Sequence, residues 1–194
     1  MKLQKKNLLP TVVLVLICLS VALLLAAVNL VTRDVIAEND RIALENSLNE
    51  ALPGEGYEEL PITDEMLEAV KNATAHKITL THLYRETSGR GFVVTLENSS
   101  GYTGKPIAIT IGIDATDRVS RIILTNNPET KITKEIEAYP DAFAGLGAEE
   151  SRALDVVAGV TYSSKAIKES VAAAIAVVWI AEGRNDYWMG GARS

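Results

Sequence analysis

The chain has 194 residues, of which 47% are hydrophobic and only 5% are aromatic, and its formal net charge at pH 7 is −6. This negative charge argues against a nucleic-acid-binding surface, because phosphate backbones attract positive charge. The single cysteine, Cys18, excludes an intramolecular disulfide and a thiolate metal cluster, and two histidines are too few for a His-rich metal site.

Residues 11–31 form an apolar run without a charged side chain, which is long enough to span a bilayer as a helix. Lys2, Lys5 and Lys6 precede the run, and acidic residues dominate the segment after it. The positive-inside rule therefore predicts that residues 1–10 lie in the cytoplasm and that the apolar run crosses the cell (inner) membrane. The rest of the chain is then expected on the outer side of that membrane. A cleaved signal peptide is the alternative, but the run exceeds the usual apolar region and no A-x-A site follows it. We expect an uncleaved, single-pass anchor.

Residues 32–54 are predicted to form a juxtamembrane helix. Ile36, Leu44 and Leu48 recur near helical spacing, with charged residues between them. Pro53 and Gly54 are expected to end this helix. Its periodicity fits both a stalk and a helix packed on the domain that follows.

Residues 55–183 are predicted to form one extracytoplasmic domain, which begins with a loop at 55–63 and is followed by a tail at 184–194. Runs rich in β-branched residues predict strands at 78–84, 92–96, 107–113 and 119–124. Apolar spacing and capping residues predict helices at 64–72, around 131–137, near 139–144 and at 164–182. The fold class is therefore α+β, with an antiparallel sheet flanked by helices.

The last of these helices has the strongest pattern. It has an apolar stripe formed by Ile167, Val171, Ile175 and Val178. Gly183 is expected to stop it, because glycine commonly follows the last helical residue.

The segment just before this helix carries the main functional signal. It contains Gly159 and Thr161 at the passage into the helix. The first N–H groups of a helix lack internal partners and favour an anion, for which phosphate is a natural choice, and a hydroxyl there can be esterified. The alternative is ordinary helix capping by Thr161, Ser163 or Ser164.

Several segments together resemble a known family. They are Gly-Tyr-Thr-Gly-Lys-Pro-Ile at 101–107, Ile-Gly-Ile-Asp-Ala at 111–115, the strand pattern at 119–124, Asp-Val-Val-Ala-Gly-Val-Thr at 155–161 and Ser-Ser-Lys-Ala at 163–166. With the N-terminal span, they resemble the G subunit of the Rnf ion-translocating electron-transport complex. That subunit has an FMN-binding domain related to the C subunit of sodium-pumping NADH:quinone reductase, which is usually longer.

The resemblance implies a cofactor site. In this family the motif Asp-x-x-Ser/Thr-Gly-Ala-Thr carries FMN through a phosphoester on its last threonine, which matches Thr161. Ala158 and Val160 depart from the motif, and we expect the bulk of Val160 to lie beside the attachment site, outside the packed core. A second family segment, Glu-Thr-Pro-Gly-Leu-Gly, is matched only by its first two residues. The implied cofactor-binding set is Thr161, Asp155, Gly159, Val160, Tyr162, Ser163, Ser164, Lys165, Glu129 and Thr130, with no catalytic and no metal-binding residue.

The resemblance also implies a function. We expect an electron-transfer subunit of an ion-translocating ferredoxin:NAD oxidoreductase, with covalent FMN on Thr161 and no independent turnover. Its partners would be the other Rnf subunits and an FAD-dependent flavin transferase. Two alternatives stay open: a membrane-anchored sensor or binding module of the same fold without covalent flavin, and a structural subunit. Flavin absorbance that survives denaturation separates the first function from the other two.

Overall fold

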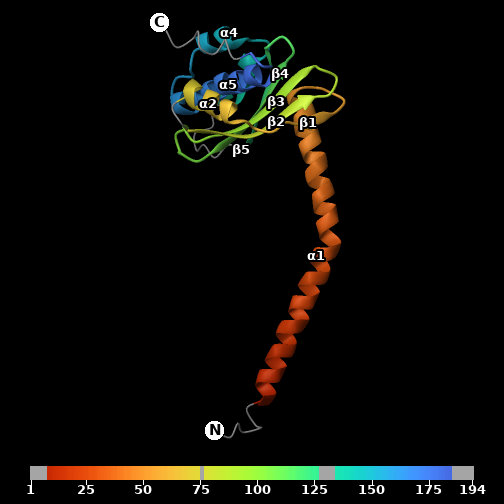
Figure 1. The fold of residues 1–194 in the computed structure, drawn as a ribbon. Coiled ribbons are helices and arrows are strands. Elements are labelled where there is room, and N and C mark those ends of the chain that lie inside the picture. Colours follow the sequence, from red (N-terminus) through yellow and green to blue (C-terminus); the bar gives the residue numbers. More distant parts are fainter. Residues whose placement is uncertain (1–7, 75–76, 127–133, 185–194) are drawn as a thin grey trace. The chain divides into compact units, whose positions relative to one another are not determined.

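The computed structural model describes residues 8–74, 77–126 and 134–184. The chain divides into two compact units, Met1–Leu44 and Glu45–Ser194. Figure 1 labels the strands and most of the helices, which are numbered in chain order. The predicted cytoplasmic segment before residue 8, the first residues of the helix expected around 131–137 and the tail after residue 184 lie outside the described residues.

Helix α1 (Leu8–Ala51) supplies the whole described part of the first unit. Its segment Pro10–Leu30 has a mean hydropathy of 3.0 and is entirely exposed. Within the described residues it is the one helix long and apolar enough to cross a membrane. The predicted span and juxtamembrane helix are thus one continuous helix, which ends before Pro53 as expected.

In the described part of the second unit, five strands form an antiparallel sheet in the order β1-β2-β3-β4-β5. Their bounds are β1 (Tyr57–Glu59), β2 (Ile78–Glu86), β3 (Gly91–Asn98), β4 (Ile107–Asp114) and β5 (Val119–Asn126). The helices are α2 (Asp64–Ala73), α3 (Lys134–Ala138), α4 (Ala148–Ala153), α5 (Thr161–Ala181) and the short 3-10 helix at Pro140–Phe143. The predicted α+β class and antiparallel sheet are confirmed.

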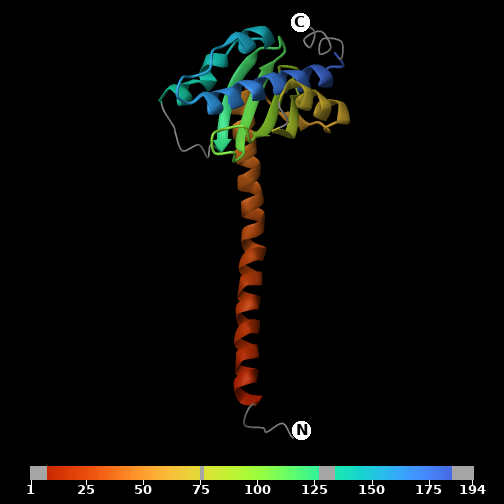
Figure 2. The ribbon, with the colours of Figure 1, turned by 90° about the vertical axis from the view of Figure 1, so that its left-hand side faces the viewer.

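The main core lies between the sheet and α5, which crosses one face of the sheet in Figure 2. Alternate residues of β3 and β4, such as Val94 and Ile109, are fully buried there. The predicted stripe of α5 is confirmed, because all four of its residues are at most 2% exposed: Ile167, Val171, Ile175 and Val178. Gly183, with φ of 74°, follows the last turn of α5, as predicted.

The end of α1 belongs to the second unit and packs on the other face of the sheet. Leu48, Ala51 and Leu52 are buried in a cluster with Tyr84 and Val93. Gly112 of β4 makes this approach possible, because a Cβ atom there would lie 2.1 Å from the carbonyl oxygen of Ala51.

A buried carboxylate on β2 forms hydrogen bonds with the segment that follows α1. Glu86 accepts hydrogen bonds from the backbone N–H groups of Arg90 at 3.0 Å, Ser88 at 2.9 Å and Glu55 at 3.1 Å, and from the Ser88 hydroxyl. These bonds, above all those from Arg90 and the Ser88 hydroxyl, lower the pKa of Glu86 to about 2 although burial opposes them. Gly54 leaves room for this side chain, since a Cβ atom there would lie 2.4 Å from the Glu86 Cγ.

Three expectations about the fold are corrected. The segment 55–63 is not only a loop, because β1 pairs with the end of β2. Helix α4 was not predicted from the sequence. Helix α5 begins at Thr161 rather than at 164, so the residue of greatest interest lies inside the helix.

Candidate functional site

The N-terminus of α5 is built by a left-handed glycine. Gly159 has φ of 82°, and the chain then enters the helix through its N-cap residue, Val160. The N-cap therefore carries no hydroxyl, and none of the three predicted capping candidates, Thr161, Ser163 and Ser164, occupies the cap position. The capping interpretation of Thr161 is wrong, because Thr161 is the first residue of the helix.

Thr161 is exposed, and within the described residues its hydroxyl makes no hydrogen bond. The first intrahelical bond runs from the Ser164 N–H to the Val160 carbonyl at 3.1 Å. The N–H groups that precede such a bond point out of the helix toward its N-terminal end. The space around Gly159 is open, since a Cβ atom there would have nothing within 4 Å. The turn that precedes Thr161 is therefore not crowded by other protein atoms at Gly159.

Two side chains of α5 form hydrogen bonds with the backbone of the loop that precedes this helix. The Ser164 hydroxyl is fully buried, accepts the Val157 N–H at 3.1 Å and contacts the Val160 carbonyl at 3.1 Å. The ammonium group of Lys168 donates to the Leu154 carbonyl at 2.8 Å. Ser164 therefore fixes the shape of the loop in this structure, and its hydroxyl is turned inward.

The other predicted residues of the motif differ in their exposure. Asp155 and Tyr162 are exposed, Tyr162 with 65% of its surface, whereas Ser163 is buried. Lys165, one turn after Thr161, is exposed and lies 3.7 Å from the Glu169 carboxylate. Burial first and the Asp155 charge second raise the pKa of the nearby Tyr139 hydroxyl.

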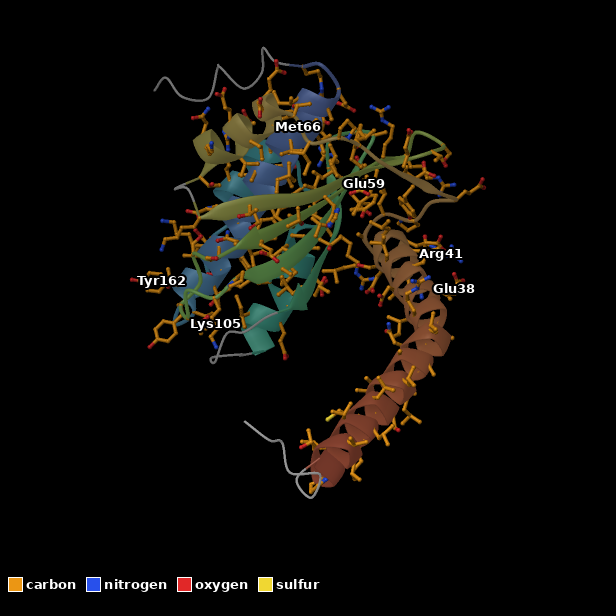
Figure 3. All side chains as sticks on the ribbon, turned by 60° about the horizontal axis from the view of Figure 1, so that its bottom comes forward. Glu38, Arg41, Glu59, Met66, Lys105 and Tyr162 are labelled. Carbon is orange, nitrogen blue, oxygen red and sulfur yellow. The ribbon has the colours of Figure 1, made fainter. Side chains whose placement is uncertain are left out.

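The loop between β3 and β4 lies against the same half of α5. Buried Asn98, the last residue of β3, donates to the Ala166 carbonyl of α5 at 2.7 Å. Figure 3 shows Lys105 of this loop and Tyr162 of α5 at the same end of the domain. Four large hydrophobic side chains are exposed in the described residues beyond α1: Tyr102 of the β3–β4 loop, Val156 of the loop before α5, Tyr162 of α5 and Leu67 of α2. The start of α5 thus carries an exposed Thr161, whose hydroxyl makes no hydrogen bond within the described residues, beside the exposed Tyr162.

Two family models match the chain: the RnfG N-terminal region over residues 1–51 and the FMN-binding domain over residues 101–176. The chain belongs to the RnfG subunit family. The second match begins in the β3–β4 loop and contains Thr161 and most of α5. No curated protein matches the chain. The predicted resemblance is confirmed, and the RnfG matches support a membrane-anchored, FMN-binding subunit of the Rnf complex.

Some of the RnfG site predictions cannot be located in the structure. Glu129 and Thr130 lie outside the described residues. Within residues 8–74, 77–126 and 134–184, no group of three or more side chains is placed to hold a metal ion.

An open pocket of about 240 Å³ is lined by Leu60, Pro61, Thr63, Glu65, Met66, Ile180 and Ala181. It lies near the last turn of α5, about 28 Å along the helix from Thr161.

Val160 is the clearest correction within the site. Its side chain is only 6% exposed and belongs to the main hydrophobic core, so the expectation that it lies outside the packed core is wrong. The N-cap conformation, with φ of −130° and ψ of 36°, accompanies an inward side chain beside an exposed Thr161. The bulk of Val160 is therefore not an obstacle on the surface that carries Thr161.

We expect Val160→Ala to lower the free energy of unfolding by about 2 kcal/mol, because it removes two buried methyl groups and leaves a cavity. Denaturant unfolding of the full chain in detergent measures this loss. Ala158→Gly, at an exposed position in the same turn, is the neighbouring control. A Val160→Ala protein as stable as the wild type, but modified faster by a flavin transferase, would contradict the buried position of this side chain.

Proposed function

We propose that Thr161 carries FMN through a phosphoester and that the chain passes electrons within an ion-translocating ferredoxin:NAD oxidoreductase. The observation that carries the proposal is the exposed Thr161 hydroxyl at the first position of a long buried helix, where it makes no hydrogen bond within the part of the chain that the structure describes. It is supported by the FMN-binding family match across this segment. FMN supplies a carrier that takes up and releases electrons one or two at a time, while the protein supplies its place and surroundings.

The residues around Thr161 have distinct parts in this proposal. An FAD-dependent transferase joins the Thr161 oxygen to the FMN phosphorus, AMP leaves, and the hydroxyl proton is released. The remaining ester charge is stabilised by the first-turn N–H groups of α5 and by the helix dipole, an effect of about 0.3–1 kcal/mol at an exposed site. Lys165 adds a mobile positive charge one turn away. Ser164 and Lys168 act indirectly, by holding the loop in front of the helix.

The main alternative is a membrane-anchored sensor or binding module of the same fold without covalent flavin. Ala158 and Val160, which depart from the family motif, are the observations that favour it. The burial of Val160 counts against this alternative, because its side chain does not face the partner that would modify Thr161. The third candidate, a purely structural subunit, gives no reason for an exposed hydroxyl at this helix start.

The test is to isolate the protein from cells that contain the transferase and to denature it fully. Covalent attachment predicts that flavin fluorescence stays with the polypeptide on a denaturing gel. A sensor with dissociable flavin would release all fluorescence, and a structural subunit would carry none. Either result would contradict the proposed function.

The same proposal places residues 33–194 on the outer side of the membrane, because Lys2, Lys5 and Lys6 precede the span. We therefore expect an impermeant amine-reactive label to reach lysines of the domain, such as Lys105, in intact cells. Labelling before and after lysis, followed by peptide mapping, measures this. Peptides of the domain that become labelled only after lysis would show the opposite orientation.

A further inference from the structure

Asn98 ends β3 with a fully buried side-chain amide whose hydrogen-bonding capacity is completely used. Its Nδ2 atom donates to the Ala166 carbonyl at 2.7 Å and to the Ser170 hydroxyl at 3.0 Å, both on α5. Its Oδ1 atom accepts the Ser100 N–H at 2.8 Å and also the Ser100 hydroxyl. An amide offers two donors and two acceptor sites, so all four are satisfied.

These bonds join two segments that are far apart in sequence. The Asn98 Nδ2 group bonds α5 at Ala166 and Ser170, which follow Thr161 by five and nine residues. Its Oδ1 atom bonds the start of the loop at 99–106. The Ser170 hydroxyl closes the network by bonding the same Ala166 carbonyl at 2.9 Å. A buried polar network in which every member is satisfied fixes one arrangement of its parts.

The loop is also fixed at its other end. Ile107, the first residue of β4, lies directly opposite Asn98 in the β3–β4 pairing. The Ser100 hydroxyl lies 3.4 Å from the Glu169 carboxylate, and Glu169 pairs with Lys165 at 3.7 Å. Asn98 thus lies at the base of a loop with exposed Tyr102 and Lys105, and Figure 3 shows Lys105 at the same end of the domain as Tyr162 of α5.

We propose that Asn98 is a positioning residue for the flavin site: its amide holds the loop at 99–106 against α5 and thereby sets the surroundings of a cofactor attached to Thr161. The inference rests on the proposed function. Packing alone does not require an amide here, because apolar neighbours such as Val94 and Leu96 already bury β3 against the core. What the amide adds is the link between the loop backbone and the helix.

Three variants separate the parts of this link. Asn98→Leu keeps a similar volume and loses both sides of the network. Asn98→Asp keeps the acceptor for Ser100 and loses the donors to α5. Ser100→Ala removes only a hydroxyl at the loop and tests the proposal if either Asn98 variant fails to fold. Thr110→Val is the matched control, because Thr110 is a buried polar residue of the adjacent strand whose hydroxyl lies 3.5 Å from the Thr95 hydroxyl, its one hydrogen-bond partner among the described residues.

The readouts are the fluorescence anisotropy and the midpoint potential of the attached flavin in the full chain, measured well below the unfolding temperature. We expect all variants to keep the wild-type level of flavinylation. Both Asn98 variants should lose anisotropy and shift the potential, with Asn98→Leu showing the larger change, while Thr110→Val changes neither. Wild-type anisotropy and potential in both Asn98 variants, with only a lower unfolding temperature, would reduce Asn98 to a structural role and overturn the proposal.

A flavin-free measurement distinguishes failure of this inference from failure of the proposed function. In the Thr161→Ala background, hydrogen exchange of the backbone amides at 100–105 reports on the loop directly. Faster exchange there with Asn98→Leu, but not with Thr110→Val, is expected whether or not flavin is attached to the wild type. Unchanged exchange would overturn the role of Asn98 even if Thr161 proves to carry FMN.

Discussion

Thr161→Ala is expected to abolish covalent flavin completely and to leave the fold intact. The substitution removes the oxygen that the phosphoester requires, so no flavin fluorescence should remain with the denatured chain. Thr161 is exposed and is not the N-cap, so no capping bond is lost. Alanine also favours the helix more than threonine does. The free energy of unfolding should therefore change by less than about 0.5 kcal/mol.

Thr161→Ser is the matched control, because it keeps a hydroxyl at the same helical position. It should retain flavin, with a rate of modification set by the preference of the transferase. Thr125→Ala, at an exposed position on β5, controls for the general effect of removing a surface threonine. Flavin that remains bound to denatured Thr161→Ala protein would show that the attachment residue lies elsewhere.

Gly112→Val is expected to cause the largest loss of stability among these variants. A Cβ atom at Gly112 would lie 2.1 Å from the carbonyl oxygen of Ala51 and 2.6 Å from its carbonyl carbon, so the end of α1 must move off the sheet. Forced overpacking of a well-packed core costs about 3 kcal/mol at the upper end of its usual range. Denaturant unfolding of the full chain in detergent measures the loss.

Ala108→Val is the control for this variant. Ala108 lies four residues earlier on β4, is half-buried, and already has a Cβ atom. Valine there should cost less than about 1 kcal/mol, because β-branched residues favour strands. Equal losses for the two variants would mean that contact with Ala51 does not set the requirement for glycine.

The sequence was most informative where the hydrophobic pattern was long. The stripe of α5 covers several turns, and β2 to β5 each have eight or nine residues, so burial on one side leaves a clear period. The three residues of β1 and the six of α4 are too few for a period to appear. These two elements depend on their tertiary partners, which a local pattern does not contain.

The site was predictable only in part for a similar reason. The position of Thr161 at a helix start followed from local sequence, although Gly159 brings that start three residues earlier than the apolar pattern suggested. The burial of Val160 depends on how the chain turns into α5. The link from Asn98 to Ala166 and Ser170 joins residues 68 and 72 positions apart, and no local signal indicates it.

The most direct test of the account is to locate the modification by mass spectrometry. The full chain is produced with the transferase, digested, and the peptide that contains Thr161 is fragmented. The expected result is a mass increase of one FMN minus one water, on the Thr161 oxygen and absent from Ser163 and Ser164. An unmodified peptide from protein made with an active transferase, or a flavin located on a different residue, would contradict it.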